Sequence, residues 1–98
     1  MPRAKTVEEA REEFLHHLRG LAAYWSEVPN QTIRERCDGL VFSILNIFDG
    51  TSAGFPAMNI ALAPHKDDQA FNEAEGENWY ESGMIINDCY LHEMYFKK

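Results

Sequence analysis

Residues 40–48 constrain the fold more than any other stretch of this chain. Most of the segment is large and apolar, namely Leu40, Val41, Phe42, Ile44, Leu45, Ile47 and Phe48. A helix or a strand built from this sequence has no polar face to turn toward water, so the segment must be covered on nearly all sides. We therefore expect it to form the centre of the core.

Two helices are predicted around this stretch. Apolar residues recur every three or four positions over residues 7–28, and again over residues 31–48. Thr6 is placed to cap the first helix, and Thr32 with Glu35 has the spacing of a capping box. Because the connecting loop is short, the two helices should pack as an antiparallel hairpin. A strand at 40–48 is the alternative, because the run is also rich in β-forming residues; the cap signals favour a helix.

The second half of the chain predicts smaller elements. Apolar and small residues alternate over residues 57–63 between two prolines, which indicates a short β element, with residues 83–86 as a candidate second strand. Two shorter helices are expected over residues 65–76 and 87–96. The predicted fold class is therefore α+β. The alternative is a mostly α fold with an extended segment packed across the hairpin.

Length and composition favour one domain, residues 1–98, with residues 1–6 as a flexible tail. A chain of this size is expected to bury roughly 60–70% of its unfolded surface, enough for a core without a metal or a disulfide. Cys37 and Cys89 are accordingly expected to be free, small core residues rather than a disulfide. No apolar run is long enough to span a membrane and the first residues do not resemble a signal peptide, so a cytoplasmic location is expected.

The net charge of −7 is unevenly distributed. Residues 1–36 are electrically balanced, whereas the segment from Asp67 to Glu93 holds eight carboxylates and neither lysine nor arginine. Such a surface repels nucleic acid and anionic membranes, so neither is expected as a partner, and it attracts a basic protein. The alternative is a solvated acidic face that keeps the protein soluble.

Several short motifs spread over residues 36–95 resemble a family of small bacterial proteins of unassigned function. The matching residues are Gly39-Leu-Val-Phe-Ser-Ile-Leu45 with Asp49-Gly50, Pro64-His65-x-Asp67-Asp68, Gly76-Glu-Asn-Trp79-Tyr80 and Leu91-His92-Glu93. The resemblance supplies no catalytic residue, so the functional hypotheses rest on the residues themselves. No cofactor is expected.

One group of side chains has the chemistry of a metal site. Imidazoles and carboxylates bind zinc, manganese or iron, and the candidates are His65, Asp67, Asp68, His92 and Glu93. Neighbours such as His92 and Glu93 point about 100° apart on a helix, so they do not bind one ion together easily. The alternative is structural: His65 follows a strand, Asp67 or Asp68 caps a helix, and His92 is half-buried.

A second group has the composition of a binding surface. Its members are acidic or aromatic and close together in sequence, namely Asp67, Asp68, Glu73, Glu75, Glu77, Trp79 and Tyr80. Tyrosine and tryptophan dominate the energetics of protein interfaces, and the surrounding carboxylates suit a basic partner. The alternative is that Trp79 anchors its loop to the core.

Three functional hypotheses follow, and no motif supplies a catalytic residue for any of them. The first is a non-enzymatic interaction protein, of an inhibitor or immunity type, acting through the acidic C-terminal half. The second is a metal-binding protein or metal-dependent enzyme using His65, Asp67 or Asp68, and His92. The third is a structural homo-oligomer, with the first helix as a homodimer interface, because that helix carries extra apolar residues beside its heptad seam.

Overall fold

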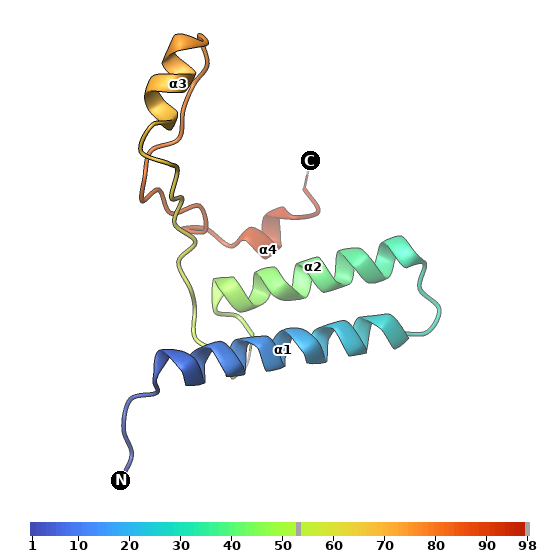
Figure 1. Cartoon of the computed structure of the whole chain (residues 1–98). Helices are drawn as coiled ribbons and strands as arrows, with labels where there is room; N and C mark the ends of the chain where they lie inside the picture. The colour runs from blue at the N-terminus through green and yellow to red at the C-terminus, as the bar shows by residue number, and fades with distance from the viewer. Residues whose placement is uncertain (53, 98) are drawn as a thin grey trace.

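The computed structural model describes residues 1–52 and 54–97, and its described part contains four helices. They are α1 (Val7–Glu27), α2 (Ile33–Asp49), α3 (Asp68–Ala74) and α4 (Leu91–Met94). Helices α1 and α2 lie side by side in opposite directions, and the short α4 packs on α2 (Figure 1). The predicted antiparallel hairpin is therefore confirmed.

Local hydrogen bonds explain where the two long helices begin. The Thr6 hydroxyl accepts the Glu9 N–H at 3.1 Å, and the Glu9 carboxylate accepts the Thr6 N–H at 2.8 Å. Thr32 and Glu35 form the same reciprocal pair at the start of α2. Each box satisfies two backbone donors that the helix itself leaves unpaired. The boundaries are thus encoded by residues three positions apart.

Close packing of one indole ring joins the two helices. Trp25 of α1 lies over Gly39 of α2, so closely that a Cβ atom built on Gly39 would meet the ring at 2.4 Å. The indole N–H also donates to the Ser43 hydroxyl at 3.0 Å. Near the other end of the pair, the Phe14 and Phe48 ring centroids are 6.0 Å apart. A glycine is required at position 39 because any side chain would displace the tryptophan.

The predicted α+β class is wrong, because the described residues are mostly helical and contain no strand or sheet. Residues 57–63 and 83–86 do run antiparallel, but they form a single isolated bridge between Ala61 and Ile85. Prolines bound the first segment, and its small alanine side chains supply little cross-strand packing. A two-stranded ribbon without a third strand is only marginally stable in water.

The two extended segments and α3 form a projection that we call the arm (residues 57–87). It points away from the hairpin and carries α3 at its far end (Figure 1), so it does not pack across the hairpin as the mostly α alternative supposed. Asn87 fixes its base: the side-chain oxygen accepts the Ile60 N–H at 2.7 Å, and the amide nitrogen donates to the Met58 carbonyl at 2.6 Å. Asn87 is therefore no helix cap, and the last helix begins only at Leu91.

The chain is open, and this corrects the expected burial. Its radius of gyration is 17.5 Å, against about 13 Å for a compact chain of this length. It exposes 7909 Å², against about 5,700 Å² for a compact monomer of its mass, so it buries only about half of its unfolded surface. Ile47 alone among the described residues is fully buried. The apolar stretch of α2 is covered by α1 and α4 and open elsewhere.

None of the described helices combines the length and the apolar character needed to cross a membrane.

Candidate interaction site

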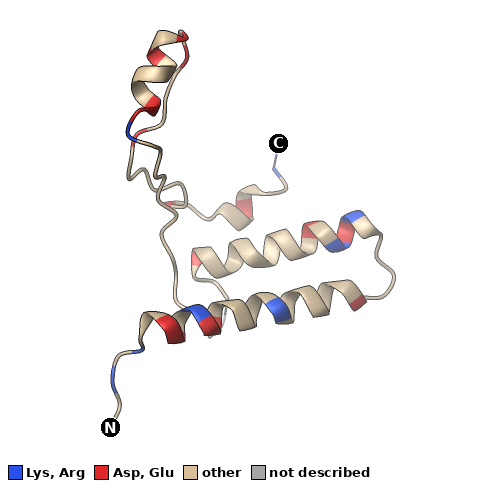
Figure 2. Cartoon of the chain, in the orientation of Figure 1, with Lys and Arg blue, Asp and Glu red and all other residues tan. Residues whose placement is uncertain are grey.

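The arm presents its carboxylates to solvent. Helix α3 contacts no other described helix, and several acidic positions lie on it and on the turns beside it (Figure 2). All five predicted acidic candidates lie here, with Asp68 half-buried and the others exposed: Asp67, Asp68, Glu73, Glu75 and Glu77. No lysine or arginine in the described part of the chain lies within salt-bridge distance of them. Among the described residues, the arm is thus an acidic surface that no lysine or arginine pairs with.

Aromatic side chains are exposed on the same arm. Tyr80 is 69% exposed, Phe71 66% and Trp79 39%. Trp79 borders one shallow hollow together with Met84, and Tyr80 borders another together with Ile86. Trp79 therefore does not anchor its loop to the helical core, as the structural alternative supposed. The arm combines carboxylates with apolar side chains that water surrounds.

Helix α2 leaves one side uncovered. Residues that contact α4, such as Asp38 and Phe42, lie on one stripe of the helix. Successive residues are about 100° apart, so the residues just before them, Cys37 and Val41, lie on a different stripe together with Ile33. All three are exposed, Ile33 by 80% and Val41 by 38%. Within the described part of the chain, this apolar stripe is therefore only partly covered.

Helix α1 contributes to the same side of the hairpin. Phe14 and Trp25 face α2, and Gly39 with Ser43 faces α1. In an antiparallel pair, residues one position after such contacts lie on one common side. On α1 the residue after Phe14 is Leu15, which is 42% exposed. On α2 the residues after Gly39 and Ser43 are Leu40 and Ile44, which are half-buried, and the exposed stripe of Ile33, Cys37 and Val41 lies next to them, turned farther from α1. We call this side the open face; its members are Leu15 and Ala22 of α1 with Ile33, Cys37 and Val41 of α2.

Two arginines flank the open face on α1. Arg11 and Arg19 are four residues before and after Leu15, so they share its side of the helix. Both are exposed, and no carboxylate of the described residues lies within salt-bridge distance of either. By the same spacing Glu8 and Glu12 share this side; both are exposed and form no ion pair among the described residues. The open face is therefore apolar with mixed charge at its edge, whereas the arm is strongly acidic.

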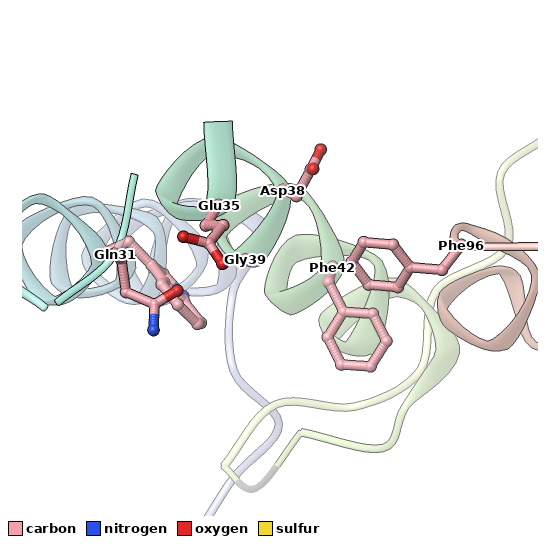
Figure 3. Close-up of a pocket in the computed structure, with 7 residues that line it drawn as sticks. Gln31, Glu35, Asp38, Gly39, Phe42 and Phe96 are labelled. Carbon is pink, nitrogen blue, oxygen red and sulfur yellow. The ribbon is translucent and has the colours of Figure 1, made fainter. Parts of the chain in front are cut away.

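An aromatic pocket of about 360 Å³ lies on the other side of the hairpin, where the C-terminal residues meet α2 (Figure 3). Its lining residues are Trp25, Gln31, Glu35, Asp38, Gly39, Phe42 and Phe96. Both carboxylates already have donors: Glu35 accepts from the Thr32 N–H, and Asp38 accepts from Arg34 and, at 2.8 Å, from the Tyr95 hydroxyl. That carboxylate raises the pKa of Tyr95. The pocket therefore offers aromatic surface rather than free charge.

The two candidate histidines occupy separate pairs. His65 lies at the base of α3, with its Nδ1 3.6 Å from the Asp67 carboxylate, and both side chains are exposed. His92 lies in α4, and its Nδ1 is 2.7 Å from Oδ2 of Asp49. The backbone N–H of His92 donates to the same oxygen at 2.9 Å. One pair thus belongs to the arm and the other to the junction of α4 with α2.

The Asp49 carboxylate is fully buried and His92 is 13% exposed. Burial raises the pKa of Asp49, but the hydrogen bonds from the His92 backbone and ring outweigh it and hold that pKa below its ordinary range. The pair fastens α4 to the end of α2. Sequence reasoning missed Asp49 because 43 residues separate the partners. The sequence did offer one signal, since Asp49 lies in the last turn of the second helix. The helix dipole disfavours a negative charge there, so the carboxylate needs a hydrogen-bond donor from elsewhere in the chain.

The described residues include no group of three histidine, cysteine, aspartate or glutamate side chains arranged to hold a metal ion. Glu93 is exposed, whereas its neighbour His92 turns toward Asp49. Cys37 and Cys89 are free thiols, as expected, but both are exposed, so the prediction that they are core residues is wrong. The structure therefore does not bring the candidate metal ligands together.

No protein-family model, no curated protein and no solved structure matches this chain. Function is therefore inferred from the geometry alone.

Proposed function

We propose that this protein is a non-enzymatic interaction protein whose acidic arm docks on a basic, apolar surface of another polypeptide. One observation carries the proposal: α3 at the tip of the arm contacts no other described helix, and the hydrogen bonds between the arm and the hairpin, among the described residues, are those of Met58 and Asn87 with Phe48 at its base. The arm exposes Phe71, Trp79 and Tyr80 among carboxylates that no lysine or arginine of the described residues neutralises.

Physical chemistry supports a binding role for such a surface. Aromatic side chains contribute most of the binding energy at many protein interfaces, and surrounding charges steer a partner and fix its orientation. The total exposed area of 7909 Å² exceeds that of a compact monomer by about 2,200 Å². Docking a partner removes part of that excess from water, which is favourable.

The test reverses charge on the arm without disturbing its fold. Glu73→Lys with Glu75→Lys places two cations at the C-terminal end of α3, where the helix dipole favours them. The tagged wild-type chain should retain a polypeptide at stoichiometric level from native lysate, or a second copy of the chain carrying a different tag. The double variant should retain at least about tenfold less, as expected when attractive charges become repulsive.

A matched control removes charge elsewhere. Glu12→Gln with Glu27→Gln changes two exposed carboxylates of α1 that form no ion pair among the described residues. Retention should not fall in this variant. Failure of the wild-type chain to retain any polypeptide, its own copy included, contradicts the proposed function. So does retention that is insensitive to the arm variant.

A further inference from the structure

We infer that the partner of the arm is a second copy of this chain: the arm of each copy docks on the open face of the other, in a twofold-symmetric, arm-exchanged dimer. This inference rests on the proposed function and names the partner of the same surface. It is carried by two surfaces of one chain, the arm and the open face: both expose apolar side chains, and the acidic arm would meet two arginines on the open face.

Exposed area provides the first argument. The excess of about 2,200 Å² over a compact monomer lies within the roughly 1,000–2,500 Å² that each subunit of an obligate dimer buries. Large apolar side chains are exposed on both surfaces, with Phe71 and Tyr80 on the arm and Ile33 and Val41 on the open face. One exchanged contact covers both sets at once, and twofold symmetry forms that contact twice.

Charge selects the arrangement. The arm carries six carboxylates and one lysine, so two arms placed against each other repel. The open face instead carries two arginines, Arg11 and Arg19, and two glutamates, Glu8 and Glu12, and none of the four forms an ion pair among the described residues of its own chain. Arm against open face therefore avoids the repulsion of arm against arm and brings Arg11 and Arg19 near the carboxylates of the arm.

Chain geometry prevents one copy from satisfying both surfaces internally. The arm leaves the end of α2 and points away from the hairpin (Figure 1), and its base is fixed by Asn87, which bonds to Ile60, Met58 and Phe48. Helix α4 occupies the other side of α2 through Asp49 and His92. The open face of each copy thus stays free for a neighbour while its own arm projects outward.

A charge-swap experiment tests this contact specifically. The first variant carries Arg11→Glu and Arg19→Glu on the open face, and the second carries Glu73→Lys and Glu75→Lys on the arm. Sedimentation equilibrium of the purified full-length chain should give twice 11.3 kDa for the wild type. Each variant alone should dimerise at least about tenfold more weakly, because like charges then meet in both contacts.

An equimolar mixture of the two variants should restore dimerisation. In the mixed dimer one contact pairs reversed charges with reversed charges, and the other is the wild-type pair. The mixture carries the same substitutions as the separate samples, so loss of folding does not explain a rescue; circular dichroism of each variant checks helix content. Rescue supports arm exchange. A dimer that neither variant weakens, or no rescue on mixing, overturns it.

A wild-type chain that sediments as a monomer at all concentrations also overturns the dimer. That result leaves the proposed function to be decided by whether a different polypeptide is retained in an arm-dependent way. Failure of the two proposals is therefore distinguishable.

Discussion

The hairpin and the arm are held by different forces. In the hairpin, side chains pack between two long helices, with the Trp25 ring against Gly39 and Phe14 against Phe48. In the arm, a few backbone hydrogen bonds and the Asn87 side chain connect two extended segments, and α3 contacts no other described helix. The hairpin is a partly formed core, whereas the arm is an extension with apolar side chains and nothing to bury them against.

This difference indicates where stability and function are separated. Substitutions in the hairpin should change the free energy of unfolding of the whole chain. Substitutions at the tip of the arm should change association and leave the monomer intact, because the segment contributes little packing to its own chain. The following experiments compare the two regions, from the largest expected effect to the smallest.

Gly39→Ala should destabilise the chain by about 2–3 kcal/mol, because the added Cβ meets the Trp25 ring at 2.4 Å and the indole must shift. Thermal denaturation followed by circular dichroism should show a loss of about 10 °C or more for a chain of this size. Gly20→Ala is the matched control. Nothing lies within 4 Å of its added Cβ, so this mid-helix change should raise stability by up to about 1 kcal/mol. Equal effects of the two changes would contradict the packing described here.

Asn87→Ala should detach the base of the arm. The change leaves the Ile60 N–H and the Met58 carbonyl without a partner, which costs about 1–3 kcal/mol for poorly solvated groups. Hydrogen exchange should accelerate at Ile60 and Ile86, whose amides belong to the arm, while amides of α1 change little. Asn59→Ala is the control, because its exposed side chain forms no hydrogen bond with the described residues. Uniform acceleration over the whole chain would show that the regions are not separable.

The local elements could be predicted because their signals lie within a few residues. Helical periodicity and the Thr6 and Thr32 caps depend on neighbours three or four positions away. The predicted sheet failed because alternation in residues 57–63 indicates an extended segment but not a stable partner strand. The Asn87 and Asp49 contacts span 27 and 43 residues, so no local pattern encodes them.

The candidate site was predictable in part for the same reason. Clustering of acidic and aromatic residues in sequence placed Asp67, Glu73, Trp79 and Tyr80 on one surface, and they do share the arm. The open face was not predictable, because the apolar stretch of α2 indicates burial and not which side lacks cover. That information comes only from the positions of α1 and α4.

Acid should release α4 from the hairpin. The pKa of Asp49 is lower in the folded chain than in the unfolded chain, so this carboxylate stabilises the fold fully above its ordinary pKa of about 3.9. Its contribution is lost as the pH falls further, through the folded pKa. The amide signals of Leu91 and His92 in NMR spectra should therefore shift in a step below about pH 4. Asp49→Asn should abolish that step, and a step that persists in this variant would assign it to another group.

Thiol labelling gives the smallest expected effect and compares the two regions directly. Cys37 is exposed in one chain and lies on the open face, where an exchanged arm would cover it. In a Cys89→Ser background, the labelling rate of Cys37 should fall severalfold as the protein concentration rises. The reason is that only the chains that remain monomeric expose this thiol. The rate in the Arg11→Glu, Arg19→Glu variant should stay independent of concentration. If the labelling rate of Cys37 does not change with concentration in the chain that retains Arg11 and Arg19, Cys37 lies outside any interface.

Small-angle X-ray scattering of the wild-type chain over a concentration series tests most directly whether a single copy leaves its arm and its open face uncovered. We expect a radius of gyration near 17.5 Å at the lowest concentration and a scattering mass that rises toward twice 11.3 kDa. A mass of 11.3 kDa throughout, with a radius of gyration near the roughly 13 Å of a compact chain, would contradict it. That result would mean that the arm folds back onto its own hairpin.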